Sequence, residues 1–432
     1  MKRSFGALVL ILLWTVLSGC NLSDNTYAGD PADNKSVQIV DWIGNSGNYS
    51  TFMEDMNREF ERRNKNIILK KVVHNGDRVA DFEIAQANKN APDMIILSYP
   101  MLSRYADKNM LEPLNDYMSA WEEAGAFKSD ILENCTVDGR IYGVPGDCYY
   151  MGMVYNKKLF REANLEEPPK NWDELLEYAK ILTDSGKNQV GFGLLTGEWV
   201  DWWFEFFVWQ AGGELTYKGE KGEIICNFTD EAVIKAAELY RRLKTERVIC
   251  PELDITNAEL QKRFAKGKVG ITFGAIGDIN VFTEAGMNKE DIGYAVFPVG
   301  PAGKNPSQFG GNMYSINAQS PPHVKEAAFK YISYLRSKEY LKKQRDSNEE
   351  NNTASSYVSV RNDIDLKQTI ADKNILDVLN SAQNNYKMEY YGKGIVGEYL
   401  NEALNNILKD DNLDIYEELK TAQEKAEKAS RE

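Results

Sequence analysis

The sequence predicts an α/β protein built from two lobes, and three observations support this prediction. Strand and helix signals alternate between residues 36 and 97, which is the rhythm of a mostly parallel sheet. A later strand, between residues 140 and 155, is interrupted by glycine and proline and then resumes, so it is a candidate crossover from one sheet into another. The chain has 432 residues, enough for two or three domains of ordinary size.

The first lobe is expected to begin with a strand–helix–strand–helix–strand unit at residues 36–42, 50–63, 67–73, 79–88 and 92–97. Open α/β sheets bind ligands at the carboxyl ends of their strands. Trp42, Ser98 and Tyr99 occupy such ends and are therefore candidate ligand contacts. Burial in the core is an equally open role for Trp42.

The candidate crossover begins with a hairpin. Asp138-Gly139 between apolar residues predicts a tight turn, and the strand that follows is broken at Gly143 and at Pro145-Gly146. Asp147 and Tyr149 come after the break, where they would lie in or beside a cleft between the lobes. An acidic group with aromatic neighbours suits sugar hydroxyls, while a half-buried place in the strand is the alternative role for Tyr149.

Residues 197–209 hold the densest run of aromatic side chains in the chain. Trp202, Phe206 and Trp209 follow the i, i+4, i+7 spacing of a helix, which is typical of a core stripe. Trp199 precedes that helix and need not belong to the stripe. An indole face stacks on a sugar ring, and the neighbouring Asp201 can accept from hydroxyl groups.

The last third of the chain offers one more candidate contact. Gly310-Gly311 would let the backbone approach a ligand closely and Asn312 would hydrogen-bond to it, although the glycines are also compatible with a simple bend. Helices are expected at residues 324–336, 375–385, 397–408 and 413–430.

The pattern of residues at the N-terminus predicts an export signal. Lys2 and Arg3 precede an apolar run that is too short to span a bilayer, and the run ends in Leu17-Ser18-Gly19-Cys20. This ending resembles the lipobox of bacterial lipoproteins, which implies that residues 1–19 are removed and that Cys20 carries the lipid. Residues 20–36 are polar and are expected to form a flexible, lipid-anchored linker.

Charge and motif content exclude several functions. The net charge is −14, which leaves no electrostatic footprint for nucleic acid. With only His74 and His323 and no Cys-x-x-Cys pair, the sequence predicts no zinc site and no cofactor. Among the remaining cysteines, a bridge between Cys226 and Cys250 is possible. A bridge between Cys135 and Cys148 would need the chain to double back beyond the predicted hairpin and is not expected.

Several of these blocks together resemble one family. The run Asp-Gly-Arg-Ile-Tyr-Gly-Val-Pro at 138–145, Tyr-Asn-Lys-Lys-Leu-Phe at 155–160 and Pro-Pro-Lys-Asn-Trp-Asp-Glu-Leu at 168–175 are similar to the signature of bacterial extracellular solute-binding proteins of family 1, the sugar receptors of ABC importers. The resemblance implies a type II periplasmic-binding-protein-like fold with three interlobe crossovers. It places lobe I at 37–145 and 272–312, and lobe II at 146–271 and 313–432.

The resemblance also implies a function and some of the site. It points to Trp199 as the ligand-facing aromatic residue and to Trp202 as a second. After the glycine at position 274 this chain has Ala275-Ile276-Gly277-Asp278 where many relatives have an aromatic residue, which removes one expected stacking group and argues against a close match to the family's usual sugars. Asp278 in this segment is a further candidate ligand contact. The implied partners are a carbohydrate, ABC permease subunits with their cytoplasmic ATPase, and the membrane through the lipid on Cys20, with the receptor acting as a monomer.

Two rival functions remain open from the sequence. An anchored carbohydrate-active enzyme would use a carboxylate pair, for example Asp147 with Asp201 near Trp199. A lipid-anchored adhesin would lack a preformed aromatic cleft.

Overall fold

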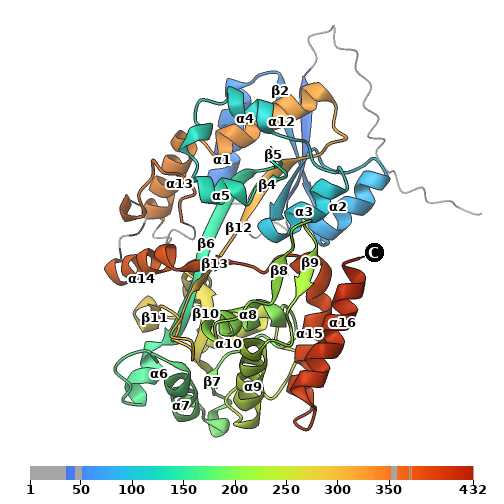
Figure 1. Ribbon diagram of the computed structural model, residues 1–432. Helices are drawn as coiled ribbons and strands as arrows, with labels where there is room; N and C mark the ends of the chain where they lie inside the picture. The colour runs from blue at the N-terminus through green and yellow to red at the C-terminus, as the bar shows by residue number, and fades with distance from the viewer. Residues whose placement is uncertain (1–35, 44–50, 352–357, 369, 371, 432) are drawn as a thin grey trace, which may run out of the picture. The chain divides into compact units, whose positions relative to one another are not determined.

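Two long strands, β6 (Val144–Asn156) and β12 (Ser307–Ile316), run antiparallel to each other from one lobe into the other (Figure 1). The structure is a computed structural model that describes residues 36–43, 51–351, 358–368, 370 and 372–431. All of these residues belong to one compact unit, Ser36–Glu432. The predicted signal, the lipidated Cys20 and the linker up to residue 35 lie outside the described residues.

Lobe I contains a mixed sheet in the order β2-β1-β3-β12-β6. Its parallel part pairs Val37 with Ile67 and Asp41 with Met94, as the predicted strand–helix alternation requires. The C-terminal half of β12 then joins antiparallel, with Asn312 opposite Ser98. The elements of lobe I before β6 are β1 (Val37–Ile43), α1 (Thr51–Arg63), β2 (Ile67–Val73), α2 (Arg78–Ala87), β3 (Met94–Ser98), the 3-10 turns η2 (Tyr99–Met101) and η3 (Ala124–Ala126), α3 (Leu102–Asp107), α4 (Asn115–Ala120), α5 (Ser129–Glu133), β4 (Thr136–Val137) and β5 (Arg140–Ile141).

Lobe II is built on the C-terminal half of β6. The segment Met151–Tyr155 pairs antiparallel with β10, β10 pairs in parallel with β7, and β11 lies antiparallel on the same end of β6. The elements of lobe II up to β12 are α6 (Lys157–Glu162), α7 (Trp172–Leu182), η4 (Ser185–Lys187), β7 (Val190–Phe192), α8 (Val200–Gln210), β8 (Thr216–Lys218), β9 (Ile224–Cys226), α9 (Glu231–Thr245), α10 (Asn257–Ala265), β10 (Val269–Ala275), α11 (Asp278–Glu284), η5 (Lys289–Asp291) and β11 (Ile292–Ala295).

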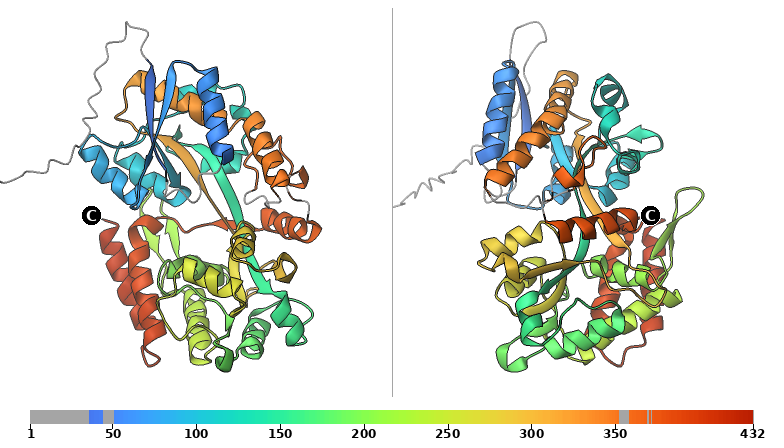
Figure 2. Two further views of the ribbon diagram at one scale, coloured as in Figure 1. Left: turned by 180° about the vertical axis from the view of Figure 1, so that it is seen from behind. Right: turned by 90° about the vertical axis from the view of Figure 1, so that its left-hand side faces the viewer.

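The chain after β12 serves both lobes (Figure 2). Helix α12 (Pro322–Leu335) packs on β1 and α13 (Lys338–Glu350) packs on α1, so both belong to lobe I. The chain then returns to lobe II, whose last elements are η6 (Leu366–Gln368) at the crossing, α14 (Lys373–Asn384), β13 (Tyr386–Met388), α15 (Lys393–Lys409) and α16 (Ile415–Ala429).

This strand pairing corrects the lobe boundaries expected from the sequence. Residues 272–312 were assigned to lobe I, but β10 and β11 pair with the lobe II half of β6. Residues 313–432 were assigned to lobe II, but α12 and α13 pack on lobe I. The crossing implied by the expected lobe boundary between residues 271 and 272 therefore does not occur there, and the third passage between lobes lies between α13 and α14, where Val358 bridges to Cys148.

Several local predictions are confirmed. Asp138 and Gly139 both have positive φ, 48° and 73°, and form the tight turn between β4 and β5. Asn171 caps α7 by accepting a hydrogen bond from the backbone N of Glu174 at 2.9 Å.

Cys135, Cys148, Cys226 and Cys250 are all buried and unbridged, so the possible disulfide between residues 226 and 250 does not form.

Within the described segments, no helix combines the length and apolar character needed to cross a membrane.

Candidate functional site

A pocket of about 480 Å³ opens where the two lobes meet. We call it the Trp199 pocket. Lobe I contributes the end of β3 and the η2 turn, β6 contributes Tyr149, and lobe II contributes the start of α8 and the start of α15. Its lining residues are Ser98, Pro100, Met101, Tyr149, Trp199, Asp201, Trp202, Glu389, Lys393, Gly394, Gly397, Glu398 and Asn401. The pocket thus brings together five residues predicted from the sequence: Ser98, Tyr149, Trp199, Asp201 and Trp202.

Trp199 is the most unusual residue in this pocket. It precedes α8 with φ 48° and ψ 40°, a left-handed conformation that costs a side-chain-bearing residue about 1 kcal/mol or more. Its indole is nevertheless 52% exposed, although it meets Trp202 edge to face at 6.0 Å. A strained backbone that presents a large apolar side chain to solvent indicates a binding role, because such strain persists mainly at functional sites.

Trp202 is the one residue of helix α8 that is not buried. The burial of all the other residues of α8 is expected for a helix that is apolar all round. The predicted core stripe is therefore correct for Phe206 and Trp209, while Trp202 is only partly buried and lines the pocket.

A cluster of charged side chains forms the floor of the pocket. Asp201 is 1% exposed and accepts a 2.5 Å hydrogen bond from the Tyr390 hydroxyl. The Lys393 ammonium lies 3.6 Å from Asp201 Oδ2 and 3.1 Å from Glu389 Oε2. Burial alone would lower the pKa of Lys393, but Asp201 and Glu389 outweigh it and the pKa is raised, so this lysine stays charged.

Glu205 lies one helical turn beyond Asp201 and is fully buried. Its Oε2 accepts a hydrogen bond from the backbone N of Tyr390 at 3.2 Å, whereas Oε1 has no hydrogen-bond partner among the described residues. Burial raises the pKa of Glu205 well above its ordinary value. The neutral form of this carboxyl is therefore favoured, which limits the negative charge under the pocket.

A second pocket of about 730 Å³ adjoins the first and shares Pro100 and Glu389 with it. We call it the hairpin pocket because the tip of the β8–β9 hairpin lines one wall. Tyr99 lines this second pocket, but only 5% of the residue is exposed. Its ring packs against Phe309 and other core residues. Its hydroxyl is buried and has no hydrogen-bond partner in the part of the chain that the structure describes.

Three predicted contacts lie at the crossing strands and line neither pocket. Asp147 forms an ion pair with Arg336 at 2.9 Å. Asn312 uses its Oδ1 to accept from the backbone N of Asp147 at 3.1 Å. A Cβ on Gly311 would come within 2.8 Å of the Asp147 carbonyl oxygen, so this glycine serves the close approach of two strands. These three residues join β6 to β12 in the structure.

The enzyme alternative required a carboxylate pair, for which Asp147 with Asp201 was the example taken from the sequence. Asp201 lines the Trp199 pocket and Asp147 does not. The oxygens that would have to act are held by Tyr390 and by Arg336. The described residues therefore do not bring this pair together at one pocket.

Trp42 also lies outside both pockets. Its ring stacks on His74 with a centroid distance of 4.2 Å and an interplanar angle of 7°. The His74 ring is in turn 2.7 Å from Asp81 Oδ2. Trp42 is thus partly covered by its own lobe, at the C-terminal end of β1 where it was expected.

Asp278 begins α11, close to the site but outside the Trp199 pocket. Its carboxylate accepts from the backbone N of Ala275 at 2.8 Å and from Gln261 Nε2 at 2.9 Å. Burial raises the pKa of Asp278 to about 6, against an ordinary value of 3.8. The pKa of Tyr149 is also raised, mainly by burial and in part by nearby carboxylates that include Asp278.

Asp278 predicts a pH dependence of stability. The folded state holds the Asp278 proton more tightly than the unfolded chain, so this contribution is complete below pH 3.8 and is lost as pH rises through about 6. Asp278→Asn is expected to raise the free energy of unfolding at pH 7 by roughly 1–2 kcal/mol. Urea unfolding at pH 4, 5, 6 and 7 measures this difference. The prediction would be contradicted if the difference in the free energy of unfolding between the variant and the wild type were the same at pH 4 and at pH 7.

Sequence reasoning missed Glu389, Lys393 and Asn401. Asn401 accepts from the backbone N of Asp201 at 2.9 Å and so fixes α15 against α8. The local signal was an acid and a lysine four residues apart at a helix start, with glycines at 392 and 394, next to a Tyr-Tyr pair. That signal alone does not show which distant segment the pair faces.

The family model of bacterial extracellular solute-binding proteins matches residues 44–342 of the chain. The chain belongs to this family. A diacetylchitobiose-binding protein from Streptomyces coelicolor is 27% identical over 65% of this chain and 65% of its own length. A maltooligosaccharide ABC transporter solute-binding lipoprotein from Streptococcus pneumoniae is 22% identical over 83% of this chain and 82% of its own length.

Solved structures confirm the fold of this family member. A solute-binding protein from Thermotoga lettingae, solved with α-D-tagatose, has a TM-score of 0.78 at 22% identity and covers 91% of this chain and 100% of its own. The predicted type II periplasmic-binding-protein-like fold is therefore correct, including the passage of the chain between two lobes.

Proposed function

We propose that this chain is a lipid-anchored extracellular receptor that captures an oligosaccharide between its lobes and delivers it to an ABC permease. The observation that carries the proposal is Trp199, an exposed indole on a strained backbone, next to the Asp201–Lys393–Glu389 charge cluster. The indole offers a flat apolar face for the C–H side of a pyranose. The cluster offers fixed acceptors and an ammonium donor to its hydroxyls, and no reaction is required of any of them.

The size and charge of the cleft support an oligosaccharide that carries no negative charge. The two pockets adjoin and share Pro100 and Glu389 as lining residues, which supports a ligand longer than one ring that extends from one pocket toward the other. Their lining holds seven acidic residues and three lysines, a difference of four negative charges. A uronate or sulfated glycan would meet net repulsion there.

Other observations support the lipid anchor of the receptor and the delivery of its ligand to a permease. The Leu17-Ser18-Gly19-Cys20 sequence supports lipidation of Cys20, and the polar segment that follows would let the receptor reach a permease. The similar S. pneumoniae protein is a lipoprotein of an ABC transporter for maltooligosaccharides. We propose the same arrangement here, with the receptor on the outer face of the cytoplasmic membrane and a cytoplasmic ATPase driving import.

Thermal unfolding tests the receptor function. The chain without residues 1–20 is screened against neutral, amino and acidic oligosaccharides. A ligand that binds only the folded state adds about 2.7 kcal/mol at a hundredfold excess over its dissociation constant. We expect a raised midpoint with one class of neutral glycan, which chromatography recovers intact. Cleavage of the glycan, or no shift with any saccharide, would refute the proposal.

A further inference from the structure

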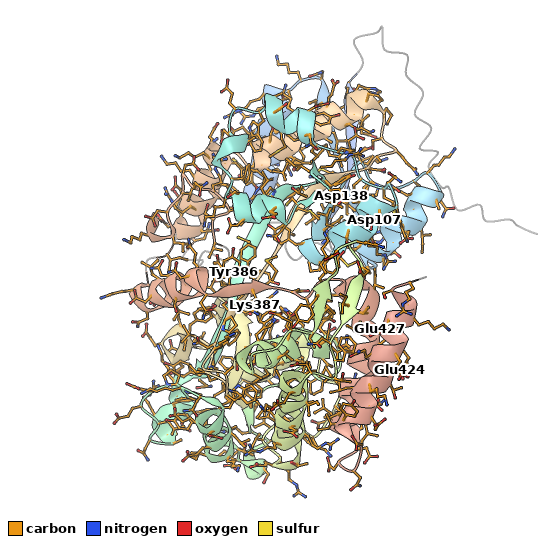
Figure 3. All side chains as sticks on the ribbon, viewed as in Figure 1. Asp107, Asp138, Tyr386, Lys387, Glu424 and Glu427 are labelled. Atoms are coloured by element: carbon orange, nitrogen blue, oxygen red, sulfur yellow. The ribbon has the colours of Figure 1, made fainter. Side chains whose placement is uncertain are left out.

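The β8–β9 hairpin faces lobe I across the hairpin pocket. Lys218, Glu220, Lys221 and Gly222 at its tip line one wall, and the opposite wall includes three carboxylates of lobe I: Asp107, Glu133 and Asp138. Asp107 ends α3, Glu133 ends α5, and Asp138 lies in the β4–β5 turn. Figure 3 shows Asp107 and Asp138 near each other at the border of lobe I that faces the hairpin.

The hairpin tip is held in place by Tyr391. The Thr216 hydroxyl donates to the Tyr391 carbonyl oxygen at 2.6 Å, and the Tyr391 hydroxyl donates to the Gly222 carbonyl oxygen at 2.8 Å. The Lys218 ammonium lies 5.5 Å from the centre of the Tyr391 ring. The lysines of the tip are thus presented by a braced turn, which lowers the conformational entropy lost when they bind an opposite charge.

The facing charges line one pocket, and their side chains are not paired with each other. Across the described ranges, no ion pair or hydrogen bond involves the side chain of Lys218, Lys221, Asp107, Glu133 or Asp138. The pKa of Tyr391 is raised by burial first and then by Asp107 and Asp138, which is consistent with both carboxylates lying on the side of the Tyr391 hydroxyl, at the tip of the hairpin. Glu220 sits between the two lysines and opposes part of their attraction.

We propose that Lys218 and Lys221 form an electrostatic latch with the Asp107, Glu133 and Asp138 carboxylates and thereby favour the approach of lobe I to lobe II. The latch regulates capture by the cleft, so it rests on the proposed receptor function. Exposed ion pairs are individually weak and are screened by salt, and two of them together change an equilibrium by about 3- to 10-fold. That range suits a receptor that has to close on a ligand and open again for a permease.

Charge reversal with rescue tests the latch. Spin labels at Lys65→Cys in lobe I and Lys289→Cys in lobe II report the interlobe distance by double electron–electron resonance. The four cysteines of the described residues are buried, so only the introduced thiols of the chain lacking residues 1–20 react. We expect K218E/K221E to lengthen the distance without ligand and to raise the Kd for the glycan found in the thermal screen about 3- to 10-fold.

The rescue variant adds Asp107→Lys and Glu133→Lys to K218E/K221E. Both positions end helices, where lysine is favourable, whereas Lys at position 138 would have to adopt the positive φ of that turn. We expect this fourfold variant to recover the wild-type distance and most of the affinity. K158E/K409E changes two exposed lysines elsewhere on lobe II by the same total charge, and we expect it to leave both measurements unchanged.

Two results would overturn the latch. The rescue variant could keep the long distance of K218E/K221E, which would show that the charges do not pair. Alternatively, K218E/K221E could lose affinity while every distance stays at the wild-type value, which would make the lysines direct ligand contacts. The distances without ligand are measured whether or not a saccharide binds, so a failed receptor proposal is distinguished from a failed latch.

Discussion

Replacing Trp199 with glycine is expected to weaken carbohydrate binding at least about 30-fold, because truncating a central tryptophan of an interface typically costs 2 kcal/mol or more. The same residue has φ 48°, which glycine adopts without strain and alanine does not. We therefore expect Trp199→Gly to be more stable than Trp199→Ala by about 1 kcal/mol. This is the reverse of the order expected inside a helix.

Calorimetric titration and urea unfolding measure the two effects separately. Tyr416→Ala is the matched control, because Tyr416 is 46% exposed on α16 and lines neither pocket. It should leave the Kd unchanged. Unaltered affinity in Trp199→Gly would remove this indole from the binding site, and equal stability of the glycine and alanine variants would show that the backbone is not strained.

The second large effect is expected at Arg336, where the crossing segments meet. The side chain is 5% exposed, pairs with Asp147 at 2.9 Å and donates to the Gly146 carbonyl oxygen at 2.7 Å. Its own carbonyl oxygen accepts from Arg361 Nη1 at 3.0 Å, and its guanidinium lies over Tyr314 of β12. One arginine thus connects β6, β12 and the third passage between the lobes.

Arg336→Met is expected to lower the free energy of unfolding by about 3 kcal/mol, because it leaves a partly buried carboxylate and a carbonyl group without their partner. Asp147→Asn should cost less, about 1 kcal/mol, since the amide oxygen can still accept from Arg336. Urea unfolding of the two single variants and the double variant measures the coupling. A loss below 1 kcal/mol for Arg336→Met, or additive effects, would show that the pair does not stabilise this junction.

Local chemistry made much of the fold predictable. The Asp138-Gly139 turn, the Asn171 cap and the first three strands each follow from signals that lie within a few residues of one another. Pairing of distant strands does not follow from such signals. The sequence of β10 reads like a crossing strand, and only its partners, β7 and the lobe II half of β6, show that it stays in one lobe.

The candidate site likewise contains some residues that were predictable from the sequence and others that were not. Trp199 and Asp201 lie in a recognisable aromatic run, and Ser98 lies at a strand end, so local position together with the family resemblance selected them. Lys393 and Glu389 line the same pocket but lie near the start of α15, far along the chain from Asp201. Their neighbour Tyr390 is 189 residues from Asp201. Asp147 had the right residue type and neighbourhood, but its arginine partner comes from the end of α12 and was not predictable from sequence.

Hydrogen–deuterium exchange with and without saturating glycan tests the location of the site most directly. If the carbohydrate binds in the Trp199 pocket, protection should rise in the backbone of residues 98–101, 199–202 and 389–401, the segments that contain its lining residues. A separate groove on lobe II is lined by residues 292–296 and 374–378 and should be unaffected. Protection confined to that groove, with none at residues 199–202, would contradict the account.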